Sequence, residues 1–404
     1  MASNFYTMPG FELYGAEERK ELQDVLDNGV LMRYGFDGMR NGHWKAKELE
    51  SLIQEKFNTK HAQLTTSGTT ALNVALATLG IGFGDEVIVP SFTFVASFEA
   101  ILMAGAVPIF VDVDDTLTLD PVAVEKAISP KTKAIMVVQM CGAMANMDAI
   151  MSIANNHNLK VIEDACQAIG GSYKGKTLGT IGHAGCFSFD FVKTITCGEG
   201  GAMITNDDTL AILADNLTDH GHDHIGNDRG AETHPFIGYN YRISELHAAV
   251  GVAQIRKLDK ILAIQRKNKK IIKDVLKQIP ELKFRNILDE EGDNASFLSF
   301  FLPSMEKANE VVLAFKQNGI GDFWNYYENN WHYIRNWHHL KEAKFLYPVS
   351  NEQKEALAKL KNQSFAQSGD VIGRNISTLI KLSWTEEEVI TRANKMAEAI
   401  KSIL

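Results

Sequence analysis

Residues 187–201 read FSFDFVKTITCGEGG and place one lysine, Lys193, between an apolar stretch and a glycine-rich loop. A lysine among mostly uncharged neighbours loses solvation for its ammonium, which favours the neutral amine that attacks an aldehyde. Pyridoxal phosphate, held as a Schiff base, is the aldehyde that this setting suits. Taken alone, Lys193 also fits an ordinary surface lysine at a strand end, which is the commoner case. The assignment therefore depends on other motifs.

A second motif, VIEDACQ at residues 161–167, is a short apolar strand that ends in an acid, with an amide three residues later. Ligands of open α/β sheets sit beyond the carboxyl ends of the strands, so Asp164 is placed to meet a ring nitrogen and keep it protonated. A protonated pyridine ring is an electron sink. On this motif alone, Asp164 could equally well be a residue that caps the following turn.

A third motif, TTSGTTAL at residues 65–72, opens an apolar helix that we expect to run to about Leu79. Helix N-termini bind phosphate, with hydroxyl donors here from Ser67 and Thr69 and close approach allowed by Gly68. A simple Ser/Thr cap fits the same residues. Shortly afterwards Phe94 follows a predicted strand, where it suits either the core or one face of a cofactor ring.

The wider pattern predicts an α/β fold. Apolar strands alternate with helical segments, which indicates a mostly parallel sheet flanked by helices. A helical pattern from Ser244 to about Ile279 predicts a long helix linking two domains. We expect a large domain over residues 1–280 and a smaller α/β domain over residues 281–404, with a strand at 295–302 and helices at 307–317 and 386–403. The strands expected in the large domain are 86–89, 107–113, 133–140, 160–164, 185–189 and 202–205.

Composition narrows the class of protein. The chain has 404 residues, a formal charge of −9 and 45% hydrophobic residues, so it can bury a large core, and its acidity disfavours nucleic acid as a partner. Residues 1–10 lack the pattern of a signal peptide, and no apolar stretch is long enough to cross a bilayer. The cysteines have no paired spacing, which suits free thiols in a reducing cytosol. We therefore expect a cytoplasmic protein without a membrane span; its cysteines are Cys141, Cys166, Cys186 and Cys197.

In this order the motifs SGTTAL, PSFTFVAS, EDACQAIG, FSFDFVKTITCGEGG and GYNYRISE resemble the sugar aminotransferases of the DegT/DnrJ/EryC1 family. The resemblance implies the aspartate aminotransferase-like fold (type I) of pyridoxal-phosphate enzymes, with pyridoxamine phosphate as an intermediate form of the cofactor. It implies Lys193 as the Schiff-base lysine, Asp164 as the partner of the pyridinium and Gln167 beside the phenolic oxygen. Gly68, Thr69 and Ser188 would hold the phosphate, and Phe94 would stack on the ring.

The same resemblance implies a homodimer with shared active sites. Residues 238–242, GYNYR, match the family motif whose asparagine reaches the partner's phosphate, so Asn240 would have that role. Some relatives carry a histidine in place of the lysine and act as dehydratases. Lys193 argues against that chemistry here.

Less generic stretches resemble those family members that move an amino group from glutamate to the C8 aldehyde of 8-oxo-3-deoxy-manno-octulosonate, giving 8-amino-3,8-dideoxy-manno-octulosonate for lipopolysaccharide. These stretches are DHGHDHIG at 219–226 with DRG at 228–230, NNWHY at 329–333 and KLSWT at 381–385. Two alternatives stay open: amination of a nucleotide-linked 3-keto or 4-keto sugar, and a non-catalytic regulator that binds the cofactor on the same scaffold.

Several residues are candidates for the substrate site. An acidic sugar needs a cation, and Arg229 is preferred over Arg33 and Arg40 because glycines bracket it in a loop. His220, His222 and His224 alternate in a loop that lacks a completing cysteine or acid, so we expect them at the sugar pocket or the dimer interface and predict no metal site. Aromatic residues crowd 324–337, where packing explains most of them, and Trp331 with His332 would lie over the mouth of the site.

Overall fold

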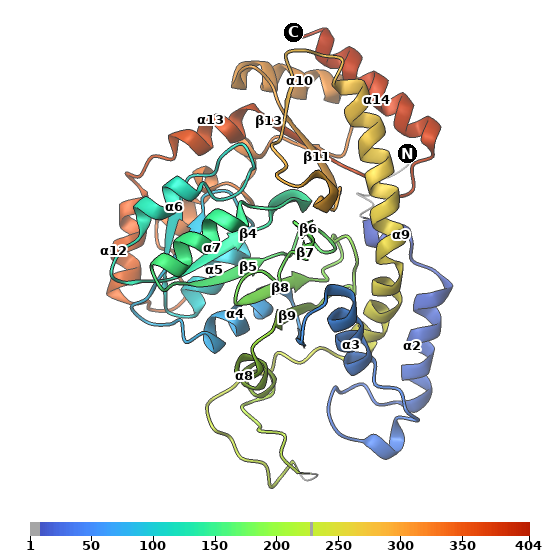
Figure 1. Cartoon of the computed structure of the whole chain (residues 1–404), viewed down its shortest axis with the longest axis vertical. Coiled ribbons are helices and arrows are strands. Elements are labelled where there is room, and N and C mark those ends of the chain that lie inside the picture. Colours follow the sequence, from blue (N-terminus) through green and yellow to red (C-terminus); the bar gives the residue numbers. More distant parts are fainter. Residues whose placement is uncertain (1–8, 227–228) are drawn as a thin grey trace.

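The computed structural model describes residues 9–226 and 229–404, so residues 1–8 of the expected N-terminal segment and Asp228 of the loop motif lie outside the described residues. Its main sheet has the strand order β1-β9-β8-β5-β4-β2-β3 (Figure 1). Strand β9 runs antiparallel to both of its neighbours, and the other neighbouring pairs are parallel. The predicted mostly parallel sheet is confirmed.

The predicted strands are found with shifts of one or two residues at most of their ends. Strand β1 was not predicted, since its sequence HAQLT contains only one large apolar residue, Leu64. The strands of the main sheet are β1 His61–Thr65, β2 Glu86–Pro90, β3 Val107–Val111, β4 Thr132–Val138, β5 Lys160–Asp164, β8 Ala184–Ser188 and β9 Gly201–Thr205, and a small hairpin is formed by β6 Ser172–Tyr173 and β7 Lys176–Thr177.

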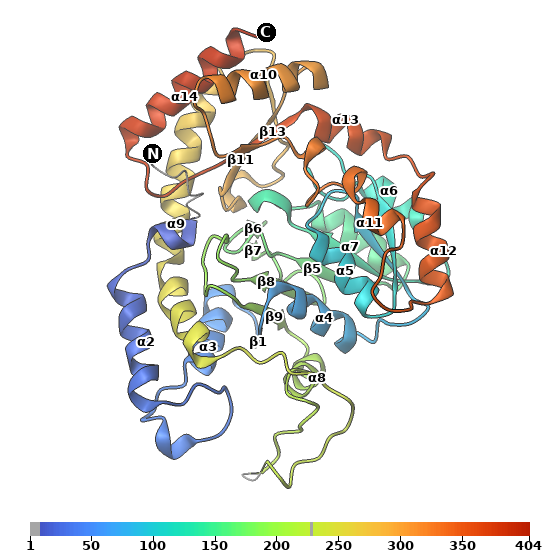
Figure 2. The same cartoon turned by 180° about the vertical axis from the view of Figure 1, so that it is seen from behind.

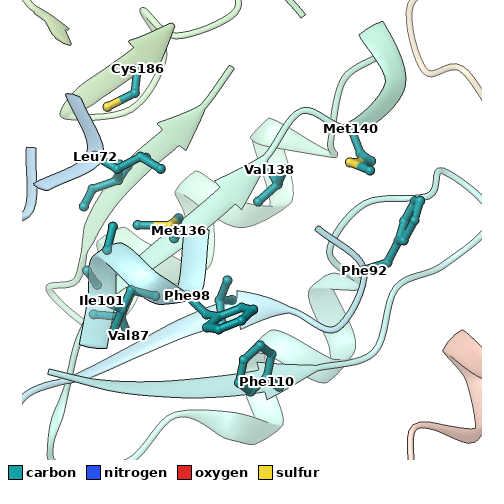
Figure 3. Close-up of a cluster of buried hydrophobic side chains, with 14 of the residues drawn as sticks. Leu72, Val87, Phe92, Phe98, Ile101, Phe110, Met136, Val138, Met140 and Cys186 are labelled. Atoms are coloured by element: carbon teal, nitrogen blue, oxygen red, sulfur yellow. The ribbon is translucent and has the colours of Figure 1, made fainter. Parts of the chain in front are cut away.

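Both faces of the main sheet are covered, which explains why its strands are apolar throughout. Alternate residues of β4 face opposite layers: Met136 packs in the cluster beneath helices α4 and α5, and Ile135 packs beneath α6 and α7. Figure 3 shows the first of these clusters, with Leu72 of α4 and Phe98 of α5 over the strand residues. The helices concerned are α4 Gly68–Thr78, α5 Val95–Met103, α6 Pro121–Ala127 and α7 Met147–Asn156.

Helix α9 connects the two ends of the molecule. It spans Glu245–Leu276, close to the predicted 244–279, and packs against α2 (Ala16–Asn28), α3 (Lys45–Phe57) and α14. Figure 2 shows it running from the region of the main sheet to that of the second sheet. Its inner face includes Leu258 and Ile261, which pack against the β8–β9 end of the main sheet.

The second sheet has the order β10-β11-β13-β12 and is antiparallel. Its strand at 297–301 and its helices at 305–317 and 386–401 confirm the three elements predicted for the C-terminal part. The domain boundary at 280/281 stays a prediction. The elements here are β10 Lys283–Phe284, β11 Phe297–Phe301, α10 Met305–Gln317, β12 Phe323–Trp324, β13 Asn375–Leu379 and α14 Glu386–Lys401.

Part of the C-terminal half returns to the main sheet. Trp337 is fully buried, with its ring 4.6 Å from that of Phe98 and 6.0 Å from that of Phe110. This packing holds residues 326–374, which include Trp331 and His332, against the edge of the main sheet. The remaining helices are α1 Pro9–Glu12, α8 Asp208–Thr218, α11 His338–Lys341, α12 Asn351–Leu360 and α13 Ala366–Arg374.

Among the described residues, no helix combines the length and apolarity that a membrane crossing requires.

Candidate active site

A cavity of about 610 Å³ lies where the main sheet, the Lys193 loop and the second sheet meet. It opens beyond the carboxyl ends of β5 and β8, where ligands of α/β sheets bind. Most of the motifs predicted from the sequence converge on it. It is lined by Ser67, Gly68, Thr69, Leu72, Phe94, Ala96, Asp164, Cys166, Gln167, Ser188, Asp190, Val192, Lys193, Thr194, Glu199, Gly200, Ser296, Phe297, Trp324, Tyr326, Trp331, His332 and Leu379.

Lys193 reaches this cavity from a closed loop between β8 and β9. Its backbone N–H donates to the carbonyl of Asp190 at 3.0 Å, and its own carbonyl accepts from the N–H of Gly10 at 3.3 Å. Gly200, with φ of 151°, supplies a backbone conformation that side chains disfavour where the chain turns into β9. The half-buried lysine is thereby held with its ammonium 6.0 Å from the centre of the Phe94 ring.

Asp164 ends strand β5 and is buried at the floor of the cavity. Its Oδ2 accepts a hydrogen bond from the hydroxyl of Ser97 at 2.6 Å, and its Oδ1 accepts from the backbone N–H of Cys166 at 3.2 Å. These two donors fix the orientation of the carboxylate. A carboxylate facing a cavity is what a protonated ring nitrogen requires.

The start of α4 forms one wall of the cavity. Ser67 caps the helix: its hydroxyl accepts from the N–H of Thr70 at 3.1 Å, and its own N–H donates to the Thr70 hydroxyl at 2.9 Å. Gly68 and Thr69, which follow the cap, line the cavity at the positive end of the helix. A Cβ at Gly68 would lie 2.8 Å from Cβ of Ser188, so only glycine fits against this strand.

Gln167 has a defined amide orientation. Its Oε1 accepts a hydrogen bond from the backbone N–H of Cys141 at 3.1 Å. The NH₂ group is therefore the end that is available to the cavity, which is the end that donates to an oxygen. Cys141 itself adopts φ of 52°, in the left-handed region, to present this N–H.

The mouth of the cavity is aromatic. The ring of Phe94 lies 5.9 Å from that of Trp331 and 5.6 Å from that of His332. Trp331 is 59% exposed, whereas His332 is half-buried and contacts Asn329 through Nδ1 at 3.1 Å. Burial, and then the nearby charge of Lys193, lower the pKa of His332 to about 3, so its ring is neutral at physiological pH.

The described residues of the 219–242 segment, 219–226 and 229–242, lie outside the cavity of their own chain. Asn240, His220, His222 and Arg229 are not among the lining residues, and the part after α8 extends away from the sheet in Figure 1. Asp219 anchors it, accepting from Arg229 at 2.8 Å and from Arg242. These residues join a site only if another chain meets this segment, so their predicted roles stay predictions.

Within this segment two histidines lie beside carboxylates. His222 contacts Glu232 at 2.8 Å, and His224 lies between Asp215 at 2.7 Å and Asp219 at 2.9 Å. Although burial alone would lower it, hydrogen bonds to both carboxylates raise the pKa of His224 to about 9. The described residues contain no cluster of three or more histidine, cysteine or acidic side chains arranged for a metal ion.

Two of the arginine candidates are structural, which corrects the sequence analysis. Arg33 forms a buried ion pair with Glu50 at 2.6 Å. Arg40 is fully buried, donates to the carbonyl of Gly35 at 2.7 Å and stacks on Trp44 at 3.9 Å. Both bind the N-terminal segment to the body, so neither is available for a substrate carboxylate.

Sequence reasoning missed several lining residues. Asp190 and Glu199 flank Lys193 in the loop, and Ser296, Phe297 and Leu379 come from the second sheet. Tyr326 and Trp324, interpreted as packing, do pack but also line the cavity. The contributions of the second sheet have no local signal, because only the tertiary fold brings residues 296 and 379 next to residue 164.

Similarity to known proteins shows the family of this chain. The model of the DegT/DnrJ/EryC1/StrS aminotransferase family matches residues 13–371. The chain belongs to this family. It is accordingly a pyridoxal-phosphate-dependent sugar aminotransferase, and the family membership shown here removes the non-catalytic regulator from consideration.

Two curated relatives are both named GDP-perosamine synthase. The protein from Caulobacter vibrioides is 44% identical over 221 residues, which is 54% of this chain and 58% of the relative, so the match spans little more than half of that protein. The protein from Vibrio cholerae is 35% identical over 289 residues, 71% of this chain and 74% of the relative. Among solved structures, the aminotransferase from Psychrobacter cryohalolentis is 26% identical with a TM-score of 0.84, covering 96% of this chain and 98% of the other.

The cavity fits pyridoxal phosphate. It combines one amine, one buried carboxylate and a capped helix N-terminus, and the glycine at position 68 lets this helix start pack closely against Ser188 of strand β8. A primary amine for the aldehyde, an anion for the ring nitrogen and N–H donors for the phosphate are the three groups that this cofactor needs.

Proposed function

We propose that Lys193 and Asp164 are the catalytic residues of an amino transfer from L-glutamate to a carbonyl group of a sugar. The observation that carries this proposal is the convergence of the Lys193 amine, the Asp164 carboxylate and the start of α4 on one cavity. When bound, pyridoxal phosphate supplies an electron sink that lets a C–H bond next to the transferred nitrogen ionise.

The chain's own residues then act as follows. The Lys193 amine would hold the cofactor through its aldehyde carbon, and when free it would take up a proton at Nζ and donate it again. Asp164 would hold a proton on the ring nitrogen. The Gln167 NH₂ would donate to the phenolic oxygen, and Phe94 would cover the ring. The phosphate would be held by Ser67, Gly68, Thr69 and Ser188.

For the acceptor, we propose a nucleotide-linked keto sugar as the first candidate. Two relatives named for the synthesis of GDP-perosamine support it. The carboxylates of Asp190 and Glu199 in the cavity wall are suited to accept hydrogen bonds from sugar hydroxyls. A nucleotide would extend past the exposed Trp331 at the mouth.

The second candidate is 8-oxo-3-deoxy-manno-octulosonate, a free sugar acid. The observation in its favour is charge: Lys193 is the one lysine or arginine among the described residues that line the cavity, alongside three carboxylates. A single carboxylate needs fewer cations than a diphosphate. The resemblance of the 219–230 and 329–333 stretches supports the same acceptor.

We propose that the active unit is a homodimer in which the 219–242 segment of one chain meets the cavity of the other. The shortage of cations in the cavity supports it, since this segment carries Arg229 and Arg242. Its exposed apolar side chains also support it: Ile237 is 91% exposed and Tyr239 is 53% exposed. In this arrangement Asn240, His220 and His222 would face the partner's cofactor and substrate.

The test follows the visible absorbance of the bound cofactor. Glutamate is added until the absorbance changes and is then removed, and the candidate sugars are added separately. Recovery with GDP-4-keto-6-deoxymannose supports the nucleotide-linked class, and recovery with 8-oxo-3-deoxy-manno-octulosonate supports the sugar acid. No recovery with either sugar contradicts both acceptors. Lys193→Ala is the control, and we expect it to bind the cofactor without turnover.

A further inference from the structure

Behind Asp164, two buried hydroxyl groups form a short chain of hydrogen bonds. The Ser97 hydroxyl lies 2.6 Å from Oδ2 of Asp164, and the Thr93 hydroxyl lies 2.6 Å from that of Ser97. Both side chains are fully buried. They come from the start of α5, whereas Asp164 comes from the end of β5.

The direction of this chain is fixed by chemistry. A carboxylate only accepts, so the single hydroxyl proton of Ser97 points to Asp164. Ser97 can then only accept from its other neighbour, so the proton of Thr93 points to Ser97. The order of donation is Thr93 to Ser97 to Asp164.

This arrangement is not what helix α5 itself requires. A serine in the first turns of a helix commonly bonds back to the carbonyl four residues earlier or caps the N-terminus. Here Phe94 is the N-cap residue, and the hydroxyl of Ser97 crosses to the sheet instead. The backbone of Thr93 is also fixed, because its N–H donates to the carbonyl of His332 at 2.9 Å.

We propose that Ser97, oriented by Thr93, is a positioning residue that holds the Asp164 carboxylate directed at the ring nitrogen of the cofactor. The inference rests on the role given to Asp164 under the proposed function. The N–H of Cys166 holds the other carboxylate oxygen, so the two donors leave the carboxylate little freedom to rotate. Without the Ser97 hydroxyl, Asp164 loses one of its two donors and is less firmly oriented.

The experiment compares Ser97→Ala with Ser97→Thr, which keeps the hydroxyl. Each variant is titrated with pyridoxal phosphate, and the absorbance of the bound cofactor is recorded against pH. We expect Ser97→Ala to bind the cofactor about ten- to a hundredfold more weakly, the range for one hydrogen bond to a charged group. We also expect the pH midpoint of its absorbance to move, and Ser97→Thr to restore both properties toward those of the unaltered chain.

Two further variants separate positioning from folding. Thr93→Val keeps the shape of the side chain and does not touch Asp164, and we expect a smaller change of the same sign. Ser91→Ala is the matched control, because Ser91 is equally buried in the same segment but bonds to Ser368 at 2.8 Å. We expect this control to change the melting temperature alone.

The outcomes distinguish this inference from the proposed function. Asp164→Asn is measured in parallel. If Asp164→Asn leaves the cofactor's affinity and absorbance unchanged, the proposed role of Asp164 is wrong. If Asp164→Asn changes both but Ser97→Ala and Thr93→Val change neither, the role of Ser97 is overturned. A Ser97→Ala protein that does not fold leaves Thr93→Val to decide, and unaltered absorbance in that variant rejects the inference.

Discussion

Gly68→Ala tests whether the start of α4 binds the phosphate of the cofactor. The new methyl group would lie 2.8 Å from Cβ of Ser188 and 3.0 Å from Sγ of Cys166. Ordinary contact begins near 3.4 Å, so the deficit against Ser188 is about 0.6 Å. Strand β8 is fixed between two neighbours, so the start of the helix has to move toward the cavity, where the phosphate would sit.

The size of the effect follows from two opposing contributions. Overpacking a close contact costs about 1–3 kcal/mol. Alanine in place of glycine in a helix returns about 0.5–1 kcal/mol. At the midpoints of these two ranges the balance is a loss of about 1.2 kcal/mol, and it falls on the bound state because the free cavity can accept the shift. We therefore expect cofactor binding to weaken about eightfold.

The assay is a titration of the cofactor-free protein with pyridoxal phosphate, followed by absorbance. Gly38→Ala is the control, because a Cβ at Gly38 has no atom within 4 Å. We expect the control to bind as the unaltered chain does. Unchanged affinity in Gly68→Ala, at a lowered melting temperature, would show that the strain is absorbed elsewhere and that the phosphate is not held at this helix.

Three other predictions follow from the structure. Glu163→Gln should lower the free energy of unfolding by about 2–4 kcal/mol in chemical denaturation. Both oxygens of the buried carboxylate accept hydrogen bonds, among them those from the N–H groups of Gly179 and Ile181, and the NH₂ of glutamine would place a donor against one of these donors. Because the pKa of His224 is raised to about 9 in the folded protein, its ion pairs should contribute their full stability below about pH 6.5 and lose it as the pH rises to about 9. The melting temperature should therefore fall over this pH range, and His224→Ala should remove that fall. An unchanged pH dependence in the variant would contradict the assignment. Trp331→Ala should leave the melting temperature unchanged, because the side chain is 59% exposed, but raise KM for the sugar several-fold more than KM for glutamate; equal changes would remove Trp331 from the sugar side of the mouth.

Local chemistry explains what the sequence predicted correctly. Lys193, Asp164 and Gly68 are each attached to the end of a strong element, an apolar strand or a capped helix. The alternation of apolar strands with helices then determines at which edge of the sheet those ends meet. The mostly parallel sheet and long helix α9 could be predicted for the same reason, because their hydrophobic periods are unambiguous.

Long-range packing explains what was missed. Arg33 and Arg40 resembled free cations until the fold placed Glu50 beside the first and backbone carbonyls around the second. The role of Ser97 could not be predicted from the sequence, because its contact with Asp164 depends on helix α5 lying against the end of β5. Strand β1 has few apolar residues, so its sequence alone did not predict a strand. Its antiparallel pairing with β9 stabilises it.

Helix α9 also decides how this enzyme can admit a substrate. Its 32 residues form one uninterrupted rod of about 48 Å that packs on α2 and α3 near one end and on α14 near the other. Swinging the second sheet away from the first would require bending this rod, which has no proline at which to kink. The two sheets are therefore held in one relative position by this helix, and a substrate would reach the cavity past the aromatic mouth at Trp331 and His332.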